Sequence, residues 1–185
     1  MSKVAVLLAE GFEESETLTI VDILRRAHIE CHMISTTGEM VRGSHDIVVK
    51  ADALISEDVK TYDMIVLPGG MPGAANLRDD ERVIQLLQEM NQSGKYVAGM
   101  CAAPLALAKA GVLENKKFTA YVGYDQKIQT SGTFKEDIVV QDGNLITSRG
   151  PATSYAFAFS LVDALGGDSM AVKKRMVYFN AFDAE

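Results

Sequence analysis

The sequence has few cysteines, and this scarcity excludes two kinds of stabilised fold. Among its 185 residues there are two cysteines, Cys31 and Cys101, and they do not form a Cys-x-x-Cys pair. A disulfide framework and a structural zinc site both need more thiols at closer spacing. We therefore expect no metal site, and we expect both cysteines to be free thiols in a reducing compartment.

Excess basic charge and long apolar runs are also absent. The formal net charge is −7, which disfavours nonspecific nucleic-acid binding and attachment to an anionic membrane, because both need a basic surface. The longest apolar run near the start, Val4–Ala9, ends at Glu10 and is too short for a signal-peptide core or a membrane span. We expect a cytoplasmic protein with no nucleic-acid or membrane partner.

Repeats, low-complexity tracts and long polar linkers are missing as well. Apolar residues make up 48% of the chain and charged residues 23%, which is ordinary for a globular protein. A chain of this length can bury a core without disulfide bonds. The sequence therefore predicts a single domain over residues 1–185.

Short apolar runs predict strands that are covered on both faces, as in a parallel sheet. The three clearest runs are Lys3–Ala9, Met64–Leu67 and Tyr96–Met100. Two weaker strand predictions are Ile29–Ser35 and Asp46–Lys50. A β-hairpin is predicted where a turn sequence, Asp142-Gly143-Asn144, separates Ile138–Gln141 from Leu145–Ser148.

Helical patterns lie between these strands. In Glu14–Ala27, the residues Leu18, Val21 and Leu24 recur at helical spacing and predict the buried face. Further helices are predicted over Asp80–Gln92, Ala102–Ala110, Ser154–Leu165 and Asp168–Tyr178. Alternation of strands and helices predicts an α/β fold, with a doubly wound, mostly parallel sheet between layers of helices.

Three loops with chemically useful residues follow the clearest strands. They are 10–16, which holds Glu10, Glu13, Glu14 and Glu16, then 68–73, which is rich in glycine, and 101–104, which begins with Cys101. Ligands in such sheets bind at the carboxyl ends of the strands. We therefore expect a thiol, carboxylates and free backbone N–H groups to converge at one end of the molecule.

Cys101 has two interpretations. It stands between an apolar strand and a helix, with the small residues Gly99 and Ala103 nearby, as in a turn that projects a nucleophile. A helix N-terminus at that point would favour the thiolate. The alternative is a small, inert core residue, which is the interpretation we favour for Cys31 within its strand.

The other two loops also allow a plain interpretation. Acidic residues favour the first turn of a helix, so most of the four glutamates need no further role. A protonated carboxyl pointing at Cys101 would instead donate a hydrogen bond to its thiolate and lower the thiol pKa; spacing does not identify which glutamate does so. Gly69 and Gly70 form either a simple turn or, with the N–H of Ala102, an oxyanion hole.

Together these segments resemble the ThiJ/PfpI superfamily, and within it the DJ-one branch. The matching motifs are Glu13–Thr17, Leu67–Gly70, Gly99–Pro104 and Thr147–Pro151, which follow the family order over almost the whole chain. The resemblance implies a flavodoxin-like fold and a homodimer. It also implies Cys101 as nucleophile, Glu16 as its protonated carboxyl partner, and Gly70 and Ala102 as amide donors.

One position departs from the family pattern. Where the branch usually has a histidine, after a short strand that follows the cysteine helix, this chain has Tyr121. Tyr121 either donates a hydrogen bond or proton to a substrate oxygen, or its presence reduces turnover. The three histidines are His28, His32 and His45, and the last stands where the resemblance places an arginine that borders the site.

The resemblance also narrows the activity. Peptidases of the superfamily carry histidine directly after the cysteine, where this chain has Ala102, and glutamine amidotransferases need a downstream His-x-Glu that is absent after His45. Some relatives carry a thiamine-biosynthesis name, for thiazole monophosphate synthesis or a kinase, but the sequence has no phosphate-binding loop.

The resemblance implies first a cofactor-free enzyme that converts methylglyoxal or glyoxal to the hydroxy acid, or that removes such groups from glycated amino acids. A second hypothesis is a redox sensor or stress-protective chaperone whose Cys101 is oxidised to sulfinate. A third is a small-molecule binding domain with an inert thiol.

Overall fold

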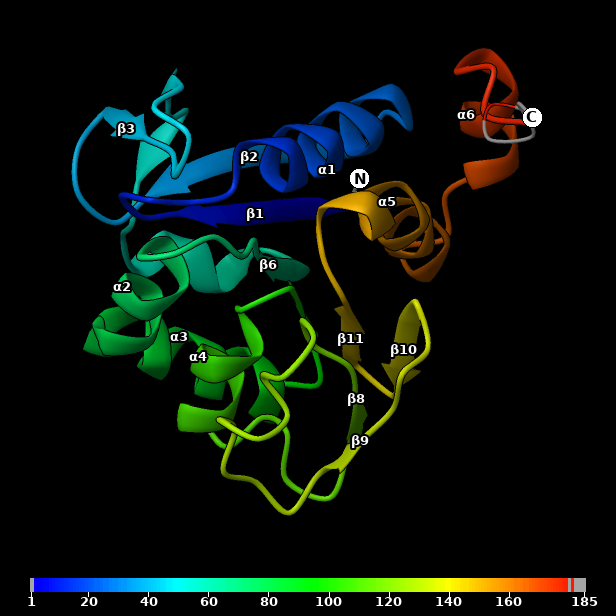
Figure 1. The fold of residues 1–185 in the computed structure, drawn as a ribbon. Helices are drawn as coiled ribbons and strands as arrows, with labels where there is room; N and C mark the ends of the chain where they lie inside the picture. The colour runs from blue at the N-terminus through cyan, green and yellow to red at the C-terminus, as the bar shows by residue number, and fades with distance from the viewer. Residues whose placement is uncertain (1, 180, 182–185) are drawn as a thin grey trace.

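A seven-stranded sheet forms the centre of the molecule, with the strand order β10-β11-β7-β6-β1-β2-β5 (Figure 1). The computed structural model describes residues 2–179 and 181. Neighbouring strands run parallel except at one edge, where β10 and β11 form the expected antiparallel hairpin. The strands of this sheet are β1 (Lys3–Leu8), β2 (Glu30–Ser35), β5 (Ala53–Leu54), β6 (Met64–Leu67), β7 (Tyr96–Met100), β10 (Val139–Asp142) and β11 (Leu145–Ser148).

Helices cover both faces of the sheet. The α-helices are α1 (Glu14–Arg26), α2 (Gly73–Asp79), α3 (Glu81–Gln92), α4 (Pro104–Lys109), α5 (Ser154–Ala164) and α6 (Ser169–Arg175). Two short 3₁₀ helices, η1 (Glu57–Thr61) and η2 (Pro151–Thr153), lie between them. Figure 1 shows α1 and α5 on one side of the sheet and α2, α3 and α4 on the other.

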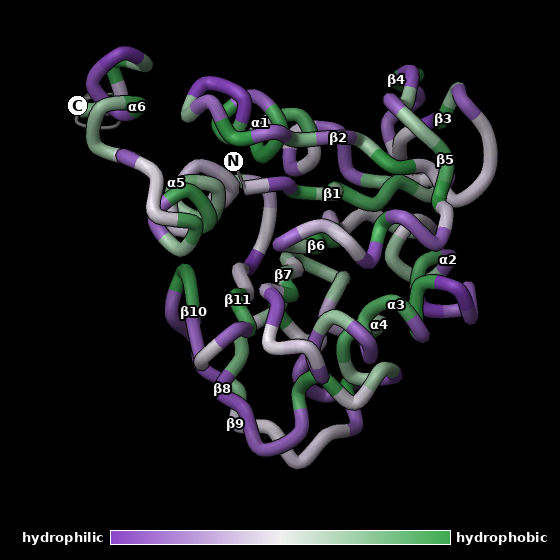
Figure 2. Tube along the Cα trace, turned by 180° about the vertical axis from the view of Figure 1, so that it is seen from behind, coloured by the Kyte–Doolittle hydropathy of each residue, from purple (hydrophilic) through white to green (hydrophobic). Residues whose placement is uncertain are grey.

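The alternation of side chains along each strand builds two cores. In β1, Val4 and Val6 pack into a cluster with residues of α1 and α5, whereas Ala5 and Leu7 pack into a cluster with residues of α2, α3 and α4. Figure 2 shows the hydrophobic colour concentrated along β1, β7 and β11, inside the layers. Because both faces are buried, the sequences of the central strands β1, β6 and β7 are almost continuously apolar rather than alternating.

The strand order creates the place for a site. Five of the parallel strands, in the order β2-β1-β6-β7-β11, follow the doubly wound order 2-1-3-4-5, and the short β5 extends this order beyond β2. After β1 the chain turns into α1 on one face, and after β6 it turns into α2 on the opposite face. The carboxyl ends of β1 and β6 therefore border a topological switch point, where ligands bind in such folds. The flavodoxin-like, doubly wound architecture expected from the sequence is confirmed.

Several local predictions were wrong. The buried face of α1 is formed by Thr17, Ile20, Val21, Ile23 and Leu24, while Leu18 is 40% exposed. The predicted strand Asp46–Lys50 shortens to β4 (Val48–Lys50) and pairs with β3 (Met40–Arg42) outside the main sheet. A further pair, β8 (Lys117–Phe118) and β9 (Thr133–Phe134), and the helix α2 were not predicted.

The last helix lies away from the three loops. Asp168 caps α6 as expected, accepting a hydrogen bond from the N–H of Ala171. Arg175 donates to the carbonyl of Arg26, the last residue of α1, whereas Glu16 lies in the first turn of that helix. Helix α6 thus packs at the opposite end of α1 from the loop of glutamates. No helix in the described part of the chain is long and apolar enough to cross a membrane.

Candidate active site

Cys101 directly follows β7 in a left-handed backbone conformation, with φ of 60°. Such a conformation costs a residue other than glycine on the order of 1–3 kcal/mol, so the surroundings must hold it. The Cys101 N–H donates to the carbonyl of Ser148 at 3.0 Å, and its own carbonyl accepts from Tyr121 N–H at 2.9 Å. This is the sharp strand-to-turn geometry of a nucleophile elbow, with the side chain 9% exposed.

Glu16 is the carboxyl that reaches the thiol. It lies in the first turn of α1 with no exposed surface, and its Oε2 accepts a hydrogen bond from Gly69 N–H at 2.6 Å. A Cβ atom built on Gly69 would lie 2.8 Å from Glu16 Oε2 and 2.9 Å from Cys101 Sγ, so the carboxyl and the thiol lie side by side. The other carboxyl oxygen, Oε1, is buried and has no hydrogen-bond partner among the described residues. Loops that follow β1, β6 and β7 therefore meet at this point, as the sequence predicts.

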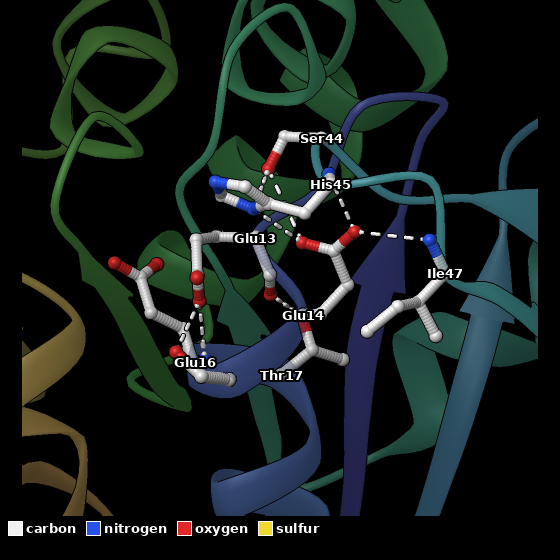
Figure 3. A network of polar contacts seen from close by, with 8 residues as sticks. Glu13, Glu14, Glu16, Thr17, Ser44, His45 and Ile47 are labelled. Carbon is white, nitrogen blue, oxygen red and sulfur yellow. Dashed lines mark hydrogen bonds and ion pairs between the residues drawn. The ribbon is translucent and has the colours of Figure 1, made fainter.

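The other three glutamates have different partners (Figure 3). Glu13 is the N-cap of α1, and its Oε2 accepts from Glu16 N–H at 2.6 Å. Glu14 is 4% exposed but binds the 44–47 loop, with its Oε1 accepting from His45 N–H at 2.6 Å. Glu10 faces the N–H of the last residue of β3. In Figure 3 the Glu16 carboxyl points away from Glu14 and His45, so the structure separates the glutamates by role.

The two glycines after β6 are required by close packing. A Cβ atom on Gly69 would lie 2.5 Å from Cys101 Cβ and 2.8 Å from Glu16 Oε2, so no side chain fits there. Gly70 has φ of 87°, and a Cβ atom would meet the Glu13 backbone nitrogen at 2.4 Å. The backbone N–H groups of Gly70 and Ala102 act on the Cys101 thiol and lower its pKa.

The thiol and the carboxyl titrate as a pair. Burial raises the pKa of Glu16 from 4.5 to about 7, against the opposing effect of its hydrogen bonds with Gly69 and Cys101. Burial and then the charge of an ionised Glu16 raise the pKa of Cys101 to about 12, while the Gly70 and Ala102 amides lower it. Because two charges are costly side by side here, the thiol keeps its proton when Glu16 ionises above about pH 7, and the pair then carries one negative charge.

The expectation that a helix N-terminus would favour the Cys101 thiolate was wrong. Helix α4 begins at Pro104, later than predicted, and it has six residues. The thiol therefore lies in a turn before the helix, where burial and Glu16 dominate its pKa. Burial also raises the pKa of Cys31 to about 12, and that side chain, 4% exposed, belongs to the core as predicted.

Tyr121 lies beside the cysteine through its backbone, and its side chain is 45% exposed. Its ring lies over Gly150, where a Cβ atom would come within 3.3 Å of the ring carbon Cδ2. The ring of Tyr124 packs edge-on against that of Tyr121. No motif in the sequence marks Tyr124. Tyr121, the residue predicted to replace the usual histidine, is therefore close to Cys101, and the phenol of Tyr124 lies next to it.

A second cluster lies on the other side of the α1 start. Glu13, Glu14 and His45 bring ligand atoms within 4.8 Å of one another, which makes them the one metal-like group among the described residues. Glu14 already accepts from His45 N–H, His45 Nδ1 and Ile47 N–H, so its oxygens are committed to the loop. The cluster thus anchors the 43–47 loop beside the site.

Comparison with known proteins places the chain in a family. Residues 2–164 match the model of the DJ-1/PfpI family. The chain belongs to the DJ-1/PfpI family. Within this family it is 39% identical to the protein dj-1beta of Drosophila melanogaster over 90% of this chain and 91% of that protein. It is also 32% identical to a deglycase of Thermococcus kodakarensis, over 88% of this chain and 99% of that protein.

Solved structures in the DJ-1/PfpI family share the fold closely. The crystal structure of Drosophila melanogaster DJ-1beta has a TM-score of 0.89 at 36% identity, covering 96% of this chain and 98% of that one. The structure of oxidized Toxoplasma gondii DJ-1 has a TM-score of 0.90 at 34% identity, covering 97% of this chain and 100% of that one. The DJ-1/PfpI relationship therefore covers the full sheet and its helices.

Proposed function

We propose that this protein is a cofactor-free enzyme that uses Cys101 to detoxify small reactive carbonyls. The proposed substrates are methylglyoxal and glyoxal, or the corresponding groups on early-glycated amino acids. The observation that carries the proposal is the adjacent, buried pair of Glu16 and Cys101, with the Gly70 and Ala102 amides acting on the same sulfur. The family relationship to a deglycase supports the same class of chemistry.

Cys101 and Glu16 supply the nucleophile and the acid–base group that the reaction needs. The Cys101 thiol passes its proton to the Glu16 carboxylate as its sulfur attacks the aldehyde carbon of methylglyoxal and forms a carbon–sulfur bond. The Gly70 and Ala102 N–H groups hold the aldehyde oxygen while it carries charge. Glu16 then gives its proton to that oxygen, which becomes the hydroxyl of a hemithioacetal, and Glu16 is a carboxylate again. By the family resemblance, Tyr121 takes the place of the usual histidine, and its phenol would donate a hydrogen bond to the substrate.

Glu16 then moves a proton between the two substrate carbons. It removes the proton from the former aldehyde carbon and returns it to the former ketone carbon, while the hydroxyl proton passes to the former ketone oxygen, so one carbon is oxidised as its neighbour is reduced. The product on sulfur is a lactoyl thioester. Water breaks the carbon–sulfur bond, releases lactate and restores the thiol, so water is the only co-reactant. A carboxyl with a pKa near 7 can both accept and donate this proton.

Lactate formation tests this proposal. We expect the purified protein to convert methylglyoxal to lactate, and we expect Cys101→Ala to abolish the conversion. Cys31→Ala is the matched control, because that thiol is equally buried in the core but has no carboxyl or amide partners from the site. Lactate production by Cys101→Ala at the wild-type rate would refute the proposal.

A second candidate function is redox sensing or stress protection through oxidation of Cys101. Two peroxide molecules each transfer one oxygen to the sulfur and leave as water, giving a sulfinate. The Gly70 and Ala102 amides and a protonated Glu16 would hold the new oxygens by hydrogen bonds. Intact mass after mild peroxide should show two added oxygens in the wild type and none in Cys101→Ser; preferential oxidation of Cys31 would contradict this function.

We also propose that the protein forms a homodimer, as the family relationship suggests. Helices α1 and α5 pack together and expose Leu18 and Tyr155, which are 40% and 39% exposed. Apolar side chains on adjacent helices favour association with a second copy. Light scattering should give twice the chain mass, and Leu18→Glu should lower it; a monomer at every concentration would contradict the dimer.

A further inference from the structure

Tyr124 stands next to the proposed chemistry without any assigned role. It lies in the segment between β8 and β9, in a turn where its N–H donates to the carbonyl of Tyr121 at 3.0 Å. Tyr121 N–H in turn donates to the carbonyl of Cys101, so two backbone hydrogen bonds link Tyr124 to the cysteine. The half-buried Tyr124 side chain packs against both hydrophobic clusters, one of which contains Cys101 and Ala102.

The orientation of the Tyr124 ring is held from several sides. Its centroid lies 6.0 Å from that of Tyr121 with an interplanar angle of 88°, an edge-to-face contact. The Lys127 ammonium lies 4.5 Å from the ring centroid, in a cation–π position. The Tyr124 carbonyl accepts from the N–H groups of Lys127 and Ile128, which fixes the turn. A side chain held in this way can present its hydroxyl at a defined point.

The hydroxyl itself has no partner. Among residues 2–179 and 181, no side chain or backbone group forms a hydrogen bond with the Tyr124 hydroxyl. The side chain is half-buried, and the hydroxyl is not among the buried polar atoms that lack a partner, so it reaches solvent and is open to a bound ligand. Burial, followed by the charges of Cys101 and Tyr121, raises the pKa of Tyr124. The phenol therefore stays neutral near pH 7, within the electrostatic reach of the sulfur, and remains able to donate.

We propose that Tyr124 contacts the substrate and donates a hydrogen bond to the second oxygen of a 1,2-dicarbonyl compound. This inference rests on the proposed function and names its substrate class more narrowly. Gly70 and Ala102 serve the oxygen on the carbon bonded to sulfur, so the neighbouring oxygen needs its own donor. That oxygen gains negative charge when Glu16 removes the first proton, and a neutral phenol stabilises the charge. Tyr121 supports the Tyr124 ring and lines the entrance.

Phenylalanine substitutions test the contact, since they remove only the hydroxyl. Tyr124→Phe should lower kcat for methylglyoxal by about 100-fold with a smaller change in KM, as expected for a donor that acts mainly in the transition state. Tyr121→Phe should lower it less. Tyr96→Phe is the matched control, because Tyr96 begins β7 at the opposite end from Cys101. A kcat of Tyr124→Phe within twofold of the wild type would overturn the inference.

A second readout does not depend on turnover. Chloroacetone alkylates a thiol by forming a sulfur–carbon bond and expelling chloride, and its ketone oxygen occupies the position of the second oxygen of methylglyoxal. Tyr124→Phe should slow alkylation of Cys101 by chloroacetone about tenfold, the value of one hydrogen bond. Its alkylation by iodoethane, which has no carbonyl, should stay at the wild-type rate.

Lactate formation and chloroacetone alkylation together separate the Tyr124 contact from the proposed function. Selective slowing with chloroacetone in a protein that makes no lactate would sustain the Tyr124 contact and remove the proposed turnover. Equal chloroacetone rates in Tyr124→Phe and the wild type would overturn the contact, even if lactate forms.

Discussion

The Glu16 carboxyl and the Cys101 thiol lie side by side at a buried point, where the charge of Glu16 raises the pKa of the thiol. The residues come from loops after two different strands and are separated by 85 positions in the chain (101 − 16). The backbone of a third loop closes the arrangement, since Gly69 N–H also binds Glu16. Because three loops hold Glu16 and Cys101 together, a substitution in any of these loops should change the distance between the carboxyl and the thiol.

Gly69→Ala should displace the pair. The added Cβ atom would overlap Cys101 Cβ and Glu16 Oε2, and a shift of about 1 Å at a reacting group can cost about 100-fold in rate. We expect a loss of that size in lactate formation, with destabilisation of about 1–3 kcal/mol from overpacking. Gly38→Ala is the matched control, because nothing lies within 4 Å of its Cβ position. Equal activity of Gly69→Ala and the wild type would show that the packing is not needed.

Burial of Glu16 should make folding stability depend on pH. The pKa rises from 4.5 to about 7 on folding, so between these values the unfolded chain releases a proton that the folded chain retains. The free energy of unfolding should therefore fall as pH rises from 4.5 to 7, by on the order of 3 kcal/mol. Denaturant titrations measure this slope.

Glu16→Gln should remove that loss of stability, because glutamine does not titrate. Glu57→Gln, at a side chain that is 88% exposed, should keep the wild-type slope. A Glu16→Gln variant with an unchanged slope would mean that Glu16 ionises normally in the folded protein.

His45 should titrate at a higher pH than an ordinary histidine. Its hydrogen bond with Glu14, and then the charges of Glu14, Glu13 and Asp46, raise the pKa of its imidazole. The pairing with Glu14 is thus present below the raised pKa and is lost as pH rises through it. NMR titration of the ring protons measures this value. Glu14→Gln should bring it down, whereas an unchanged His45 pKa in that variant would exclude Glu14 as the cause.

The strands and the overall fold could be predicted because their signals are local. The continuous apolar runs of β1, β6 and β7 reflect burial on both faces, and the strand–helix alternation then limits the topology. The apolar face of α1 was less predictable. Thr17 is fully buried while Leu18 is exposed. A prediction that assigns apolar residues to the buried face therefore places this face about one residue too far along the helix.

The site could be predicted only in part. The loops that meet were evident from the strand order, but the choice of Glu16 came from the family resemblance, because the four glutamates look alike in the sequence. No motif or pattern in the sequence indicates a role for Tyr124, because its place beside Tyr121 depends on a turn in an irregular segment. The direction in which the Cys101 pKa shifts could not be predicted from the sequence either, because burial and the neighbouring charge of Glu16 determine it.

A double-mutant cycle on lactate formation from methylglyoxal tests the central claim, that Glu16 and Cys101 act as one unit. The variants are Cys101→Ala, Glu16→Gln and the two combined. Groups that work together give non-additive losses, so we predict that each single change abolishes nearly all turnover and that the double variant is no worse than either. Substantial turnover in Glu16→Gln, or losses that multiply in the double variant, would contradict the account.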